Sequence, residues 1–168
     1  MKPAVRMRSV RNVVVALVAL GVVAGWYAFR PERLFLDQRV DEATGGSGVV
    51  IAAGAFHGVA HDGRGSASVV RRADGSRVLE LTDFETSNGP DLHLYLVAAR
   101  DATDSEGVTT AGFVTLGPLK GNVGNQAYDV PADLDLDRFR AVTVWCRRFG
   151  VNFATAPLEL PAGTAQAP

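Results

Sequence analysis

The chain lacks most of the signatures that enzyme classes require. It has one cysteine in 168 residues, Cys146, so no disulfide can form within it. It has no paired Cys-x-x-Cys, no Cys-x-x-Cys-His haem attachment motif and no His-Glu-x-x-His zinc motif. The phosphate-binding loop, the dinucleotide fingerprint and the nucleophile elbow are also absent. The sequence therefore gives no support for hydrolase or transferase chemistry, and it favours a protein that is not a stand-alone enzyme.

Acidic residues are missing from the first 30 positions, where an uncharged run of 17 residues spans 13–29. At about 1.5 Å per residue this run makes a helix near 25 Å long, at the short end of what crosses a bilayer. Four basic residues precede it: Lys2, Arg6, Arg8 and Arg11. Because positive charge is retained on the cytoplasmic side, we predict a single-pass cell-membrane protein with residues 1–12 cytoplasmic and the C-terminal domain extracytoplasmic.

A cleavable signal peptide is the alternative reading of the same segment. Small residues ending at Ala24 offer a processing site. Trp26, Tyr27 and Phe29 instead resemble an interfacial aromatic belt, which favours a retained helix. Both readings export the rest of the chain.

The exported part is acidic. From Pro31 onward it carries 12 basic and 18 acidic residues, a net charge of −6, which is a poor basis for binding nucleic acid. Residues 30–48 end in a Gly-rich stretch and predict a flexible juxtamembrane linker. Residues 49–160 form the predicted domain, and residues 161–168 a disordered tail.

Short apolar runs separated by turn residues fill the domain. No segment after Arg30 has a 3.6-residue apolar period over three turns. The pattern predicts an all-β fold, an antiparallel β-sandwich of about 7–9 short strands. The expected strands cover residues 49–56, 66–72, 77–84, 92–97, 112–116, 126–130, 141–149 and 151–160.

Cys146 is the main candidate for chemistry. As a lone cysteine it is free, paired between chains or a ligand. Strand alternation places it on the face opposite Trp145 and on the same face as Arg148, which could stabilise a thiolate. The alternative is a buried cysteine that packs as a small hydrophobe.

Histidine and aspartate supply the remaining candidates. His57, His61 and His93 are the only histidines, and with Cys146 they could form a metal or haem site if the fold gathers them. Their spacing does not require this. Asp91 follows a Gly-Pro turn, where it could lie near a binding site or simply cap the turn.

Two long stretches, residues 81–96 and 116–158, resemble the DM-thirteen domain, also called the electron-transfer DM domain. The resemblance extends over residues 50–160 and depends on several motifs in the same order. They are Gly54, Phe56, His61 and Gly65; Phe84 before Gly89-Pro90-Asp91; Tyr95-Leu96; Leu119-Lys120-Gly121; Gly124 to Pro131; Trp145-Cys146; and Phe149 through Leu158.

The resemblance implies a β-sandwich-like domain that acts in electron transfer. It implies that Cys146 works as a redox thiol or as a ligand to a prosthetic group such as haem. The family often has Phe-Gly after the cysteine strand, where this chain has Phe153-Ala154. Family members accompany DOMON modules and b-type cytochromes; neither occurs in this chain, so the implied partner is a separate cytochrome or other redox protein. The competing hypothesis is a non-catalytic binding or adhesion module.

Overall fold

The computed structural model describes residues 4–29 and 36–160 of the chain, which divides into two units after Phe35. The first unit contains the helix α1 (Ala4–Phe29). Within it, Val10–Tyr27 has a mean hydropathy of 1.7 and none of its residues is buried against protein. By length and composition this helix can cross a membrane, and a signal sequence would meet the same criteria.

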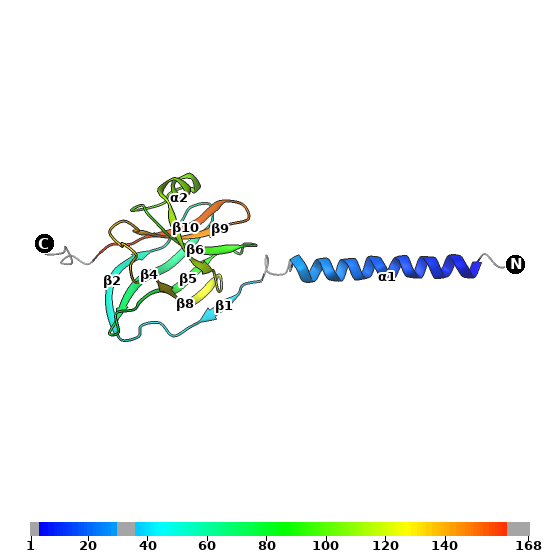
Figure 1. Cartoon of the computed structure of the whole chain (residues 1–168), viewed down its shortest axis with the longest axis horizontal. Coiled ribbons are helices and arrows are strands. Elements are labelled where there is room, and N and C mark those ends of the chain that lie inside the picture. Colours follow the sequence, from blue (N-terminus) through cyan, green and yellow to red (C-terminus); the bar gives the residue numbers. More distant parts are fainter. Residues whose placement is uncertain (1–3, 30–35, 161–168) are drawn as a thin grey trace. The chain divides into compact units, whose positions relative to one another are not determined.

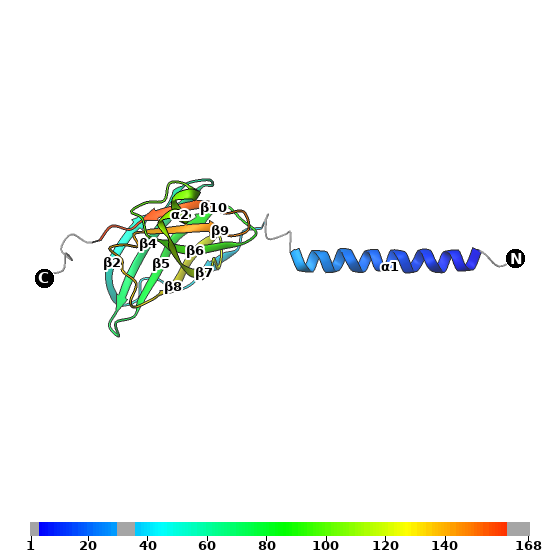
Figure 2. The same ribbon diagram turned by 45° about the horizontal axis from the view of Figure 1, so that its top comes forward.

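The second unit is a β domain with one short helix (Figures 1 and 2). Its elements are β1 (Arg39–Asp41), β2 (Gly48–Ala55), β3 (His57–Gly58), β4 (Gly63–Arg72), β5 (Arg77–Thr86), β6 (Leu92–Val97), α2 (Ser105–Ala111), β7 (Phe113–Pro118), β8 (Val123–Val130), β9 (Ala141–Cys146) and β10 (Val151–Pro157).

Two five-stranded sheets make up this domain. The first has the order β1-β8-β5-β4-β2, and the second has the order β3-β10-β9-β6-β7. All neighbouring strands are antiparallel except β1, which pairs parallel to β8. The predicted β-sandwich is confirmed, with ten strands, two of which have only two or three residues.

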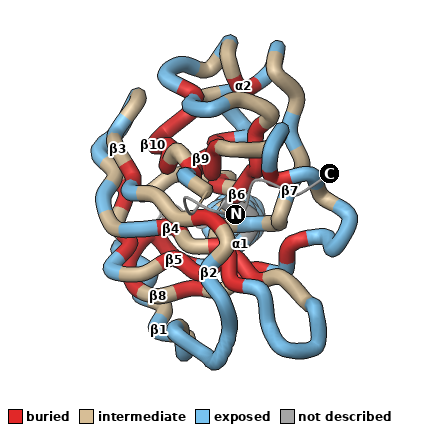
Figure 3. The backbone as a smooth tube through the Cα atoms, turned by 90° about the vertical axis from the view of Figure 1, so that its left-hand side faces the viewer, coloured by how far each residue is buried: buried red, intermediate tan, exposed pale blue. Residues whose placement is uncertain are grey.

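The core lies between the two sheets, and Figure 3 shows the buried residues concentrated in their strands. Period-2 alternation explains the packing, because every second side chain of each strand points inward. Phe84 and Leu79 project from the first sheet, and Leu94 and Val144 from the second; all are at most 1% exposed.

A second, smaller cluster covers the outer face of the second sheet. Val108 of α2 packs there with Tyr95, Trp145 and Ala102. Asp104 caps α2 by accepting a hydrogen bond from the Gly107 N–H at 2.6 Å. The sequence did not predict this helix, because seven residues make only two turns and cannot display an amphipathic period.

Two predicted boundaries differ from the structure. The strand expected over 141–149 ends at Cys146, because the chain turns and the Gly150 N–H donates to the Cys146 carbonyl at 2.9 Å. The linker expected over 30–48 contains β1, so the β domain begins at Leu36 rather than at residue 49. A strand of three residues is too short to give an alternation signal.

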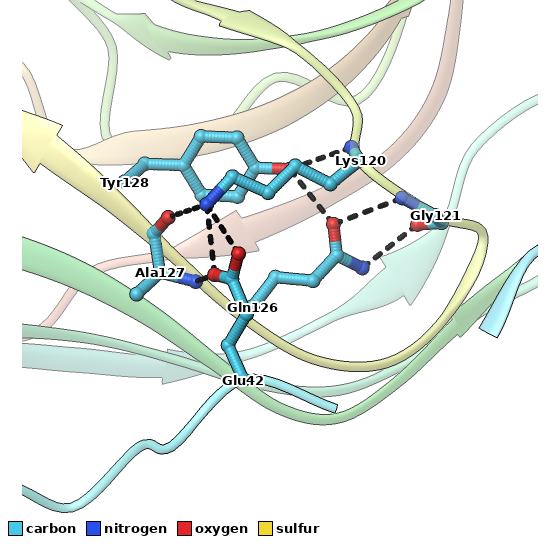
Figure 4. A network of polar contacts seen from close by, with 6 residues as sticks. All are labelled: Glu42, Lys120, Gly121, Gln126, Ala127 and Tyr128. Carbon is cyan, nitrogen blue, oxygen red and sulfur yellow. Dashed lines mark hydrogen bonds and ion pairs between the residues drawn. The ribbon is translucent and has the colours of Figure 1, made fainter. Parts of the chain in front are cut away.

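Side chains hold this early segment to the sheet (Figure 4). The Glu42 carboxylate accepts hydrogen bonds from Lys120 Nζ and from the Ala127 N–H, each at 2.8 Å. Lys120 Nζ also donates to the Ala127 carbonyl. The Tyr128 hydroxyl accepts a hydrogen bond from the backbone N–H of Lys120 and donates one to the side-chain oxygen of Gln126. Burial raises the pKa of Tyr128 to about 12.

Gly124 lets β1 approach β8 closely. Its φ is +105°, and a Cβ there would lie 2.0 Å from the Val40 carbonyl oxygen. Both the conformation and the contact require glycine.

We expect Gly124→Ala to destabilise the domain by about 1–3 kcal/mol, since it adds backbone strain and a clash with Val40. Gly75→Ala is the matched control: its φ is +85°, but no atom lies within 4 Å of the added Cβ. Urea unfolding should show a larger loss for Gly124→Ala, and hydrogen exchange should accelerate in β1. Equal losses of stability in the two variants would show that the close approach of β1 to Gly124 does not contribute to the cost of the substitution.

We expect the contribution of Glu42 to stability to depend on pH. Its hydrogen bond with Lys120, followed by that with the Ala127 N–H, lowers the pKa of Glu42 below its ordinary value of 4.5. A lowered carboxyl pKa stabilises the fold above the unfolded pKa, and the stabilisation disappears as pH falls through the folded pKa. Glu42→Gln should therefore cost about 1 kcal/mol or less near pH 7. The difference from the unmodified chain, followed by urea unfolding, should vanish in acid; a constant difference would contradict the assignment.

Candidate functional site

Four connections lie at one end of the sandwich, which we call the loop end: residues 56–62, 87–91, 119–122 and 147–150. Strand directions bring them together, since each joins strands that end or begin at the same side. Backbone hydrogen bonds fasten them to one another or to the neighbouring strands. They run from Val59 N–H to the Phe153 carbonyl, from Thr86 N–H to Asn122, from Leu119 N–H to Leu92 and from Arg147 N–H to Asp91, all at 2.8–3.0 Å.

Cys146 is at this end but inside the core. It is the last residue of β9, opposite Leu92 of β6 and Val151 of β10, and it is 0% exposed. It belongs to the cluster between the sheets, on the same strand face as Val144. A thiol in this position is shielded from reagents in solvent.

Trp145 points to the opposite face of β9, as alternation predicts. Its ring lies 6.2 Å from that of Tyr95, and Tyr95 stacks on Phe113 at 4.3 Å with an interplanar angle of 3°. Burial raises the pKa of the Tyr95 phenol; the nearby Arg147 opposes this shift and Asp91 adds to it. The sequence did not identify Phe113 as a candidate residue, and it did not predict that Tyr95 belongs to an aromatic stack.

Asp91 and His93 form a pair beside this stack. His93 Nε2 lies 3.1 Å from Asp91 Oδ1, and the side chain of His93 is 12% exposed. His93 is directly opposite Trp145 in the β6–β9 register. The fold thus brings together three sequence candidates, Asp91, His93 and Trp145, on the face of β9 that Cys146 does not share.

His61 lies elsewhere at the loop end. Its ring stacks on Phe153, with centroids 3.8 Å apart. Phe153 belongs to the same core cluster as Cys146. His61 and Ser87 also line an open hollow of about 540 Å³.

Arg148 is not where the alternation placed it. Because β9 ends at Cys146, Arg148 lies in the following turn and is exposed. The strand periodicity that put it on the face of Cys146 does not extend into this turn.

A metal or haem site does not fit these positions. His57 pairs with Asp101 at 2.9 Å, while His61 and His93 contact other partners. Within the described residues no three His, Cys, Asp or Glu side chains are grouped to hold a metal. A haem could reach the sulfur of Cys146 only by displacing core side chains, because the residue has no exposed surface.

A second hollow, of about 470 Å³, lies on the first sheet and was not identified from the sequence. Its lining includes Arg39, Asp41 and Asp83. Asp83 has φ +50°, a left-handed conformation at an irregularity in the β5–β8 pairing. Short polar residues tolerate this conformation, so no sequence signal marks the position.

Comparison with known protein families matches residues 55–158, more than half of the chain, to the family described as Electron transfer DM13. Comparison with curated proteins and with solved structures gives no significant match. The match covers β3 to β10 and all four connections of the loop end. The resemblance expected from the separate motifs is therefore confirmed, and the chain belongs to the Electron transfer DM13 family.

Proposed function

We propose that the chain is a membrane-anchored, extracytoplasmic electron-transfer domain in which Cys146 is the redox-active group and a separate redox protein is the partner. The position of Cys146 carries this proposal. In a domain of an electron-transfer family, the one cysteine lies directly before an exposed turn at the end where the connecting loops meet.

The membrane anchor in this proposal is α1. Its apolar span, with four basic residues and no acidic residue before it, supports a helix that crosses the membrane with the N-terminus inside. Cleavage after Ala24 is the competing fate of the same segment.

For the anchor, we expect the full chain to remain in the membrane fraction after alkaline carbonate extraction and to keep its whole mass of 17.8 kDa. A retained apolar helix is not extracted by high pH, because its insertion is hydrophobic. A soluble product that begins at Gly25 would refute the anchor and leave export standing.

The burial of Cys146 restricts how a redox reaction can proceed. In thiol–disulfide exchange, the thiolate attacks a partner disulfide, forms a mixed disulfide and releases the partner's second sulfur as a thiolate. The Cys146 sulfur can meet another protein only after the loop end opens, since the residue has no exposed surface. Reaction with a partner is therefore coupled to local opening of the loop end.

For the redox role, we expect the full chain in nanodiscs, in its native state, to release a thiolate from a small aromatic disulfide by forming a mixed disulfide, and Cys146→Ala should abolish this release. Val144→Ala is the matched control, since Val144 is also 0% exposed and lies on the same face of β9. Each variant should lose about 1–3 kcal/mol of stability, so lost packing alone affects both. Absorbance spectra and thiol titration of the same samples should show whether a chromophore is present and how fast the thiol reacts.

A second candidate is a binding or adhesion module in which Cys146 only fills the core. The complete burial of Cys146 favours this binding or adhesion function, because a buried cysteine packs as a small hydrophobe. A colourless chain that forms no mixed disulfide in its native state, and whose thiol reacts only after denaturation, would establish the second candidate and exclude the first.

A further inference from the structure

The domain exposes two phenylalanine side chains, one in the turn after β9 and one at the start of β7. Phe149, in the turn after β9, is 68% exposed, and Phe113, at the start of β7, is 44% exposed. By contrast, Phe56, Phe84 and Phe153 are all buried between the sheets. Single exposed aromatic side chains are ordinary on a protein surface, so Phe149 matters here only together with the charges beside it in the turn.

Phe113 belongs to an aromatic stack that extends over β6 and β9 toward the turn after β9. Phe113 rests on Tyr95, Tyr95 adjoins Trp145, and the Trp145 ring lies 4.0 Å from the position of a Cβ on Gly150, in the same turn as Phe149. Tyr95 and Trp145 are 5% and 6% exposed, so their rings are fixed. A rigid aromatic base of this kind loses little conformational entropy when a partner binds.

Two adjacent arginines complete the surface. Arg147 and Arg148 are exposed in the same turn as Phe149. The Arg147 N–H donates to the Asp91 carbonyl at 3.0 Å, which fixes the start of the turn. Among residues 36–160, neither guanidinium takes part in an ion pair. With respect to that part of the chain, both can pair with carboxylates, which arginine binds in a bidentate geometry.

This turn is positively charged, although the exported chain from Pro31 onward has a net charge of −6. Arg71 and Arg72 form a second exposed pair, but at the end of β4 away from the loop end. An acidic partner attracted to Arg147 and Arg148 is therefore oriented toward the loop end on encounter. Arginine and aromatic residues are also the side chains that contribute most binding energy at protein interfaces.

We propose that Arg147, Arg148 and Phe149 form a docking surface for an acidic patch on a protein partner. The proposal extends the electron-transfer function and rests on it for the identity of the partner as a redox protein. The docked partner covers the turn that directly follows Cys146, so binding and opening of the loop end involve the same segment.

The test measures binding of the full chain, in phosphatidylcholine nanodiscs, to a carboxylate-terminated monolayer by surface plasmon resonance. Arg147→Glu/Arg148→Glu should weaken binding by about tenfold at low ionic strength, and added salt should reduce the difference. Arg71→Glu/Arg72→Glu is the matched control, because these arginines are also adjacent and exposed, in the part of β4 farthest from the loop end. It changes the net charge equally and should change binding by less than about threefold.

Phe149→Ser should speed dissociation, and Val49→Ser, which alters a side chain 62% exposed on β2, should not. Equal losses in the two arginine pairs would overturn the docking surface, since only net charge would then matter. Stronger arginine-dependent binding to vesicles containing phosphatidylserine than to the carboxylate monolayer would also overturn it, in favour of a lipid surface. Arginine-dependent docking by a chain that forms no mixed disulfide in its native state would refute the electron-transfer function and uphold the docking surface.

Discussion

The burial of β9 on both faces is the constraint on which the domain depends. All six of its residues are buried, because one face packs between the sheets and the other lies beneath α2 and the aromatic stack. Strand alternation then separates neighbours completely: Cys146 enters the core and Trp145 faces outward. A shift of one residue in register would exchange the two and remove the thiol from the core between the sheets, so the packing on both faces fixes the position of the cysteine.

This separation gives the loop end two different sides. On the inner side the thiol is protected from solvent, while on the outer side a hydrogen-bonded Asp91–His93 pair and stacked rings lie near exposed arginines. In the proposed function the redox thiol and the docking surface lie within a few residues of each other, so one movement of the turn would control both. The same arrangement protects a lone cysteine from irreversible oxidation, which depends on exposure.

Much of this architecture could be predicted from the sequence because its signals are local. The dense apolar and β-branched residues of 141–146 predicted a buried strand, and spaced motifs predicted the family. The prediction that Arg148 shares a strand face with Cys146 was wrong, because alternation holds only within a strand and β9 ends at Cys146. The short helix over Ser105–Ala111 and the three-residue strand at Arg39 could not be predicted, since both owe their structure to contacts with distant parts of the chain. The aromatic stack likewise depends on β6, β7 and β9 lying side by side.

The network around Glu42 also covers part of the open edge of β8. Beyond Asp41, β8 has no strand on its outer side, and an edge of this kind readily pairs with a strand from another molecule. At Ala127 the Glu42 carboxylate accepts from the N–H and Lys120 donates to the carbonyl, so this residue has no free backbone group to offer (Figure 4). The segment that leads into the domain thus closes this one position of the edge to a strand from another molecule.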